Sequence, residues 1–165
     1  RPWKGMREVL DAVEATSVSD FELFIAGDVN EQDGARIENS CILRKHIRLL
    51  GVIEHERLKS AYAACDAGLG SFGLGSVGMN DGSTLKVGEY LACGLPVISG
   101  HKDARLPNGF EFYAQSDASV QGWVSLARKW RRFSRREVSY AAQAYIDKQA
   151  IMGRTVNWLK GNELL

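Results

Sequence analysis

The chain has 165 residues, a formal net charge of +1 at pH 7, 45% hydrophobic residues and 25% charged residues. These values are ordinary for a single globular domain, and the balanced charge gives no general attraction to nucleic acid, so we expect no nucleic-acid partner. Three cysteines without C-x-x-C spacing predict neither a disulfide framework nor a zinc site. No apolar run approaches the ~20 residues of a membrane span, and we expect a cytoplasmic protein with reduced thiols.

Apolar runs and segments of helical periodicity alternate along the chain. The predicted strands cover residues 21–27, 46–51, 67–72, 95–99 and 109–114. The predicted helices cover roughly residues 1–15, 34–45, 55–66 and 84–93, followed by helix from residue 117 to the end, with a new helix after a capping box at Ser134 and Glu137. Single helices between strands predict an α/β fold with a parallel sheet and helices on both faces. Ligands of such sheets bind at the carboxyl ends of the strands.

Residues 73–99, GLGSVGMNDGSTLKVGEYLACGLPVIS, open with a G-x-G-x-x-G pattern at Gly73, Gly75 and Gly78. In a dinucleotide-binding turn, the helix that holds the pyrophosphate starts on the motif itself. Here residues 79–82 intervene before the helical pattern, and Asp103 is only a loose candidate for the acidic residue that binds a ribose. An NAD(P)-dependent oxidoreductase is therefore the weaker alternative.

The helix that follows these glycines offers a different nucleotide site. Asparagine, aspartate, glycine and serine at positions 80–83 predict a turn, and Asp81 or Ser83 is predicted to cap the helix. The unpaired N–H groups at a helix start favour binding of a diphosphate. Glu89 follows Thr84 by five positions, which places its carboxylate roughly 8 Å along the helix axis, within reach of the ribose hydroxyls of a bound nucleotide.

Other readings of this helix remain open from the residues alone. Lys86 and Glu89 have the spacing of a solvated i, i+3 ion pair. Gly88 would let a ligand or a strand approach the helix closely.

Residues 86–98, KVGEYLACGLPVI, resemble the signature of the C-terminal domain of GT-B-fold glycosyltransferases of the family 4 type ("group 1"). Further similar segments follow in order: Lys4-Gly5 at the head of the first helix, FELFIAGD at residues 21–28, and Leu50-Gly51-Val52 with a later Leu and Tyr. The resemblance covers roughly residues 3–160. It implies that residues 1–165 form a Rossmann-like domain that binds a nucleotide-sugar donor, the C-terminal half of a GT-B fold.

The resemblance also implies roles for single residues. Glu89 matches the glutamate that binds the donor ribose, and Lys4 matches the lysine that contacts the donor diphosphate. The backbone of Val52 and Ile53 would meet the base, and the helix start would hold the phosphates. The donor-binding residues implied in this way are Lys4, Val52, Ile53, Gly82, Ser83, Thr84, Leu85, Lys86 and Glu89.

The chain departs from the family pattern in two respects. Asp81 stands where the family has a glutamate that reaches the transferred sugar. We take Asp81 and Glu89 as the catalytic candidates, favour a helix-capping role for Asp81, and expect backbone amides of residues 78–82 to recognise the sugar. The N-terminal acceptor domain and the first strand of the C-terminal domain are absent, so we expect a piece of a longer protein. The histidines match no catalytic position and are expected at strand edges and in loops; they are His46, His55 and His101.

The implied reaction is transfer of a hexose-like sugar from a nucleotide donor to a glycan, lipid-linked or other acceptor, with retention and without a metal or other cofactor. Polysaccharide biosynthesis is the expected context, and this chain alone is expected to catalyse little. The basic segment Arg128–Arg136 predicts a solvated helix face, with peripheral contact to the inner face of a membrane as a minor alternative. A non-catalytic interaction module with the same fold is the third hypothesis.

Overall fold

The computed structural model describes residues 5–162, and it has the predicted alternation of strands and helices. The first part of the chain contains α1 (Met6–Glu14), β1 (Leu23–Ala26), α2 (Glu31–Asn39), α3 (Cys41–His46) and β2 (Ile47–Gly51). The middle contains α4 (His55–Ala63), β3 (Gly68–Leu69), the 3-10 helix η2 (Gly75–Val77), β4 (Asp81–Gly82), α5 (Leu85–Ala92), β5 (Val97–Ser99) and β6 (Lys102–Asp103). The last part contains β7 (Tyr113–Gln115), α6 (Val120–Trp130), α7 (Arg135–Ile146) and α8 (Lys148–Gly161).

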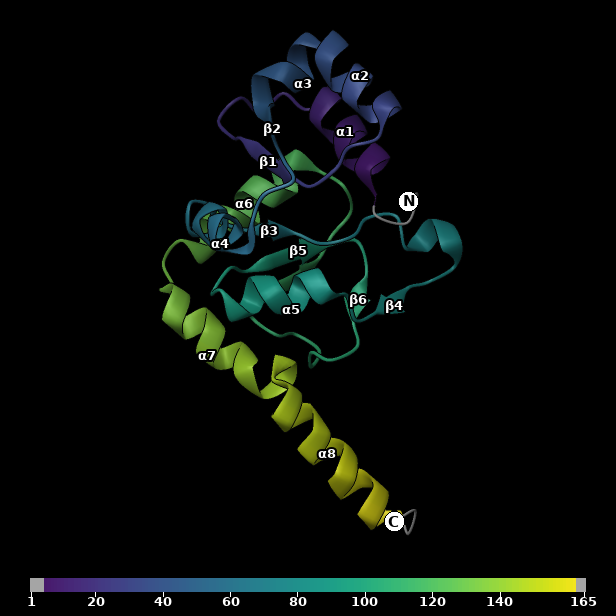
Figure 1. Cartoon of the computed structure of the whole chain (residues 1–165), viewed down its shortest axis with the longest axis vertical. Helices are drawn as coiled ribbons and strands as arrows, with labels where there is room; N and C mark the ends of the chain where they lie inside the picture. Colours follow the sequence, from purple (N-terminus) through teal and green to yellow (C-terminus); the bar gives the residue numbers. More distant parts are fainter. Residues whose placement is uncertain (1–4, 163–165) are drawn as a thin grey trace.

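All strand pairs in the described residues are parallel, which confirms the predicted α/β class. The strands form three ladders, β1–β2, β3–β5–β7 and β4–β6. In Figure 1, α5 lies on one side of the β3–β5–β7 sheet and α6 on the other, while α1, α2 and α3 gather around β1 and β2. The carboxyl ends of β3 and β5 therefore lie at the edge where ligands of parallel sheets bind.

One hydrophobic core joins α1, α2, α3, α5, α6 and α7 to the sheet, because each of these helices buries part of one apolar face. In α5 the buried residues are Val87 and Leu91, which share one face at i and i+4. β5 is buried along its whole length, as expected for a central parallel strand covered on both faces. Trp123 and Trp130 of α6 also lie in the core, where the Trp130 indole donates to the Glu111 carbonyl at 2.8 Å.

Two predicted boundaries were wrong, and in both cases a local polar group outweighs the apolar pattern. The predicted helix at 34–45 is two helices, because Ser40 ends α2 and its hydroxyl accepts the backbone N–H of Leu43 at the start of α3. The predicted strand at 109–114 begins only at Tyr113, because a turn in which Phe110 N donates to Pro107 O precedes it. A short apolar run next to Pro-Asn-Gly therefore begins in a turn, and the strand starts only after it.

The capping box predicted at the start of α7 is confirmed, since the Ser134 hydroxyl and the Glu137 carboxylate bond reciprocally to backbone N–H groups. After α7, helix α8 extends away from the sheet (Figure 1) and has no buried residue among those described. Trp158 on α8 is 60% exposed. In the part of the chain that the structure describes, no helix combines the length and the apolar character needed to cross a membrane.

Gly94 ends α5 in the left-handed conformation, with φ of +73°, as its position after the helical pattern predicts. A Cβ atom there would lie 2.3 Å from the Arg135 carbonyl oxygen, so α7 packs directly against the glycine backbone. Gly153 on α8 has ordinary helical backbone and open space around it.

We therefore expect Gly94→Ala to lower the free energy of unfolding by about 2 kcal/mol or more, because it adds left-handed strain to a steric clash. Gly153→Ala is the control and should leave stability unchanged or raise it by about 0.5–1 kcal/mol. Urea unfolding monitored by circular dichroism measures both. Equal stability of the two variants would contradict the described contact between α5 and α7.

Candidate functional site

The start of α5 carries backbone N–H groups that no side chain caps. Thr84 is the N-cap residue, with extended backbone (φ −84°, ψ 143°), and no side-chain hydrogen bond caps this helix end. The prediction that Asp81 or Ser83 caps the helix is therefore wrong. Because the first N–H groups of a helix have no partner within the helix, this end can hold an anion such as a phosphate.

Asp81 does not cap the helix because it belongs to a strand. β4 and β6 pair in parallel, with Asp81 opposite Lys102 and Gly82 opposite Asp103. Lys102 N donates to Asn80 O at 3.1 Å, and Ala104 N donates to Gly82 O at 3.2 Å. The segment before α5 is thus held by backbone hydrogen bonds to the chain that follows β5, and Asp81 remains exposed beside the helix start.

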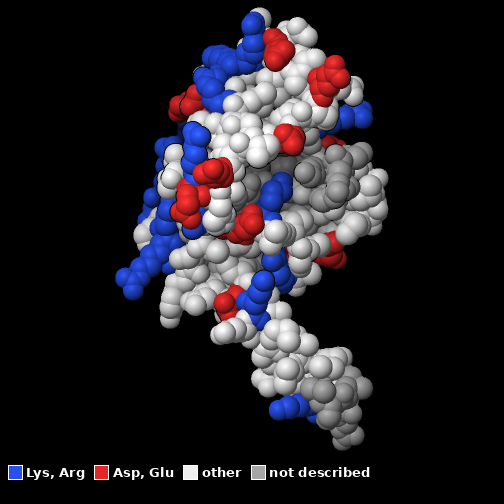
Figure 2. Space-filling view, viewed as in Figure 1, with Lys and Arg blue, Asp and Glu red and all other residues white. Residues whose placement is uncertain are grey.

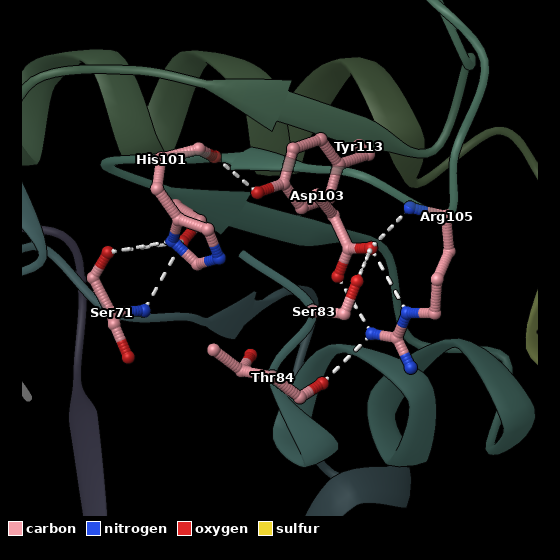
Figure 3. A network of polar contacts seen from close by, with 8 residues as sticks. Ser71, Ser83, Thr84, His101, Asp103, Arg105 and Tyr113 are labelled. Atoms are coloured by element: carbon pink, nitrogen blue, oxygen red, sulfur yellow. Dashed lines mark hydrogen bonds and ion pairs between the residues drawn. The ribbon is translucent and has the colours of Figure 1, made fainter. Parts of the chain in front are cut away.

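A buried ion pair supports the same helix end (Figure 3). The Asp103 side chain is 0% exposed and accepts from Arg105 N at 3.0 Å, Nε at 2.9 Å and Nη2 at 2.6 Å. Arg105 Nη2 also donates to the Thr84 carbonyl at 2.8 Å. The side-chain hydroxyl of Ser83 lies 3.5 Å from the Asp103 carboxylate. The pair therefore joins β6 to the N-cap of α5.

These contacts overturn two expectations from the sequence. Asp103 is buried and committed to Arg105, so it cannot be the surface acid that binds the ribose of a dinucleotide. Gly88 makes room for a side chain of this chain and not for a ligand or a strand, since a Cβ at Gly88 would lie 3.0 Å from Arg105 Nη1.

The glycine pattern at Gly73, Gly75 and Gly78 does not have the geometry of a dinucleotide-binding turn. It surrounds the three-residue 3-10 helix η2, which Gly78 ends with φ of +74°. The next α-helix starts at Leu85, after β4 has intervened. Because the pyrophosphate of a dinucleotide needs the N–H groups of a helix that begins on the motif, the oxidoreductase interpretation is not supported.

Glu89 of α5 lies near Tyr62 of α4. It is half-buried, and its carboxylate forms no hydrogen bond or ion pair with any residue of the described chain. Tyr62 of α4 packs edge-on against Tyr90 with ring centroids 5.0 Å apart. Burial, and secondarily the nearby Glu89 carboxylate, raises the pKa of Tyr62 to about 12. Glu89 therefore lies outside the apolar core.

The ion pair between Lys86 and Glu89, left open as an alternative by the sequence, is absent from the ion pairs between described residues. Lys86 Nζ lies 3.5 Å from the carbonyl oxygen of Gly70 at the end of β3. The first turn of α5 is therefore next to the carboxyl end of β3, while Leu85 in the same turn is 76% exposed.

The segment predicted to meet a base follows β2. Val52 is 75% exposed, and Ile53 lines a cavity of about 400 Å³ together with Leu50 and three residues of α4, which are Arg57, Ser60 and Ala61. Tyr62 of α4 contacts Tyr90, which follows Glu89 in α5. Helix α4 therefore lies near both this cavity and Glu89. Figure 2 shows a hollow between the lobe of α1–α3 and the part below it, with acidic and basic side chains at its border.

Lys4 lies outside the described residues. The next residue, Gly5, packs against the loop after β3, since a Cβ there would lie 2.6 Å from Gly73 N and 2.7 Å from Phe72 N. The start of α1 is therefore beside the carboxyl end of β3.

The histidines have structural surroundings of different kinds. His46 ends α3, is buried and stacks on Phe21 with ring centroids 4.2 Å apart, and His55 is exposed at the start of α4. His101 is 1% exposed in the loop after β5, where its Nδ1 lies 2.8 Å from Ser99 Oγ. The Tyr113 hydroxyl donates to the His101 carbonyl. The sequence placed His101 in a loop but gave no sign of this buried polar network.

The basic segment Arg128–Arg136 is largely compensated by acidic neighbours. Its ion pairs in the described structure are Arg128–Asp20, Arg131–Asp66 and Arg132–Glu111. Arg135 donates to the carbonyl oxygens of Ala63 and Cys65. Such pairing favours the predicted solvated helix face over a membrane-binding surface. Residues 5–162 contain no group of three or more acidic, histidine or cysteine side chains arranged to hold a metal ion.

Removing the Arg105 guanidinium would leave the buried Asp103 carboxylate without its partner. We therefore expect Arg105→Leu to lower the free energy of unfolding by about 3 kcal/mol or more. The control is Arg128→Ala, which removes an exposed ion pair and should cost less than about 1 kcal/mol. Urea unfolding compares the two variants, and a cost for Arg105→Leu no greater than that of the control would show that the pair does not support α5.

Comparison with known families agrees with the geometry. Residues 1–121 match the family described as glycosyl transferases group 1. No protein of curated function matches the chain. The match covers most of the 165 residues and includes every element from α1 to the start of α6. The chain therefore belongs to the group 1 glycosyltransferases.

Proposed function

We propose that this chain binds the nucleotide-sugar donor of a retaining glycosyltransferase. The family supports sugar transfer in general, and the uncapped start of α5 is the observation that carries the donor-binding proposal. The backbone N–H groups of Ser83, Leu85 and the other residues in the first turn after Thr84 would bind the donor diphosphate, and Gly82 would lie beside the transferred sugar. Lys4 would add a cation from outside the described residues.

Glu89 would bind the ribose of the donor. Its carboxylate is half-buried and unpaired within the described chain, so both of its oxygens are available to accept ribose hydroxyls. The backbone of Val52 and Ile53 would meet the base, next to the cavity between β2 and α4. A nucleotide in this arrangement runs from the start of α5, past Glu89, toward the cavity beside α4.

The proposed chemistry places the leaving diphosphate at the helix start. Negative charge that develops on its oxygens during transfer would be stabilised by the N–H groups and by Lys86 and Lys4, with no requirement for a metal ion. Asp81 is exposed at the edge of this site, opposite Lys102 in the β4–β6 ladder, from which it would approach the transferred sugar. The acceptor, a glycan or a lipid-linked saccharide, would be bound by a second domain outside residues 1–165.

Calorimetric titration with UDP, GDP and NADH tests this proposal. We expect UDP or GDP to bind and NADH not to bind. Glu89→Gln should weaken binding of the nucleoside diphosphate about tenfold, since hydrogen bonds to a charged group contribute about 1.5 kcal/mol or more. Glu38→Gln, an exposed substitution on α2, is the matched control and should not change binding.

Binding of NADH alone would favour an oxidoreductase. If none of the three nucleotides binds to the wild-type chain, the chain is an interaction module with the same fold. If Glu89→Gln and Glu38→Gln bind equally well, Glu89 has no role at the ribose.

A further inference from the structure

Three polar side-chain atoms near the start of α5 are buried without a hydrogen-bond partner in the described protein. They are Ser71 Oγ, Thr84 Oγ1 and His101 Nε2. The Lys86–Gly70 contact of 3.5 Å brings the first turn of α5 to the end of β3, and Figure 3 shows Ser71, Thr84 and His101 around this junction. Because folded proteins rarely leave buried polar atoms unpaired, three such atoms at one place indicate that it recognises a polar group.

The hydrogen bonds around His101 fix the chemical character of its free nitrogen. Ser99 Oγ accepts from Ser71 N and donates its only proton to Ser71 O, both at 3.1 Å. His101 Nδ1 lies 2.8 Å from Ser99 Oγ and 3.2 Å from Ser71 O, and a carbonyl oxygen can only accept. We therefore assign the ring proton to Nδ1, which makes Nδ1 the donor to both oxygens. In this tautomer Nε2 is a hydrogen-bond acceptor.

Positively charged groups gather around the start of α5. The start of α5 carries a partial positive charge, Lys86 lies in its first turn, and the Arg105 guanidinium is bonded to Thr84 at the same helix end. The Asp103 carboxylate is the nearest acidic group along the chain, and it is neutralised by Arg105. A lone pair on Nε2 cannot bind a phosphate oxygen, because both atoms are acceptors. It can accept a hydrogen bond from a hydroxyl group.

Gly82 separates Nε2 from the candidate site. A Cβ at Gly82 would lie 3.8 Å from His101 Nε2, 3.5 Å from His101 Cδ2 and 3.4 Å from Leu74 Cδ1. Gly82 itself is partly exposed. Because Gly82 has no side chain, only its backbone lies between the imidazole and the solvent-exposed side of this segment. Gly82 directly precedes the proposed phosphate-binding turn.

We propose that His101 Nε2 accepts a hydrogen bond from a hydroxyl group of the transferred sugar, which makes His101 a specificity-determining residue. This inference rests on the proposed donor-binding function. The hydroxyls of Ser71 and Thr84 can each donate or accept, so together with Nε2 they suit a ligand that carries several hydroxyl groups. The diphosphate, by contrast, is held by the N–H groups of α5.

The test compares nucleotide sugars with the nucleotides that lack the sugar. His101→Asn can place its amide N–H where Nδ1 donates to Ser99, and it removes Nε2 together with the ring carbons next to it. We expect the Kd for UDP-glucose or GDP-mannose, whichever the wild type binds, to rise about 5- to 10-fold, as the loss of one hydrogen bond predicts. The Kd for the matching UDP or GDP should change less than about twofold. Calorimetry measures both constants.

Two further variants separate recognition from folding. Gly82→Ala leaves the imidazole intact but covers its edge at ordinary contact distances, and it should produce the same selective loss of sugar-nucleotide binding. His46→Asn changes a buried histidine in α3, away from α5, and should leave the ratio of the two constants unchanged. If His101→Asn does not fold, Gly82→Ala decides the question. Nitrogen-15 NMR of the imidazole should also show Nε2 shifting with the nucleotide sugar and not with the nucleotide.

An equal loss for nucleotide and nucleotide sugar would assign His101 a structural role and overturn the inference. Unchanged binding of both ligands to His101→Asn would also overturn it. If the wild type binds the nucleotides but the variants change the Kd for nucleotide and nucleotide sugar by the same factor, nucleotide binding is supported and the proposed role of His101 is wrong. If the wild type binds neither kind of ligand, the proposed function itself fails.

Discussion

The position of the first turn of α5 depends on hydrogen bonds that come from residues 102–105. The β4–β6 ladder holds the backbone of residues 80–82, and Arg105 holds the carbonyl of Thr84 while it neutralises the buried Asp103. As a result, the helix starts without a side-chain cap and its N–H groups stay unpaired at the carboxyl edge of the sheet. A rigid backbone that presents unpaired donors does not have to reorganise when an anion binds, and this favours both binding and transition-state stabilisation.

The same edge of the sheet carries a buried polar network that has little role in the hydrophobic core. Ser99 at the end of β5 joins Ser71 to His101, and Tyr113 of β7 donates to the His101 carbonyl. Burial raises the pKa of Tyr113 to about 12, so the phenol stays protonated and remains a donor at neutral pH. Ser99 ends β5 and Tyr113 begins β7, so this network joins the loop after β3 to both strands, and the proposed sugar-recognising atom belongs to it.

Much of the fold could be predicted from the sequence, because the alternation of apolar runs with helical periodicity is strong in this chain. The α/β class, the place of α5, the end of α5 at Gly94 and the capping box at Ser134 were all predicted correctly. The helix break at Ser40 and the late start of β7 were missed, since single side-chain caps and turns compete with periodicity at short range.

The surroundings of the site were harder to predict. β4 and β6 are two residues each, too short for any periodic pattern, so Asp81 was assigned to a cap instead of a strand. The Asp103–Arg105 pair and its contact with Thr84 join residues 21 positions apart, which no local pattern can indicate. The resemblance to the family located α5 and Glu89, whereas the partners of Arg105 and the burial of His101 depend on tertiary packing.

The most direct measurement is the map of amide chemical-shift changes on addition of UDP or GDP to the isotope-labelled chain. The account predicts that the largest changes fall on the N–H groups of residues 83–87 at the start of α5, with smaller changes near Glu89 and after β2. Large changes confined to residues 73–78, or no change at the start of α5, would contradict it.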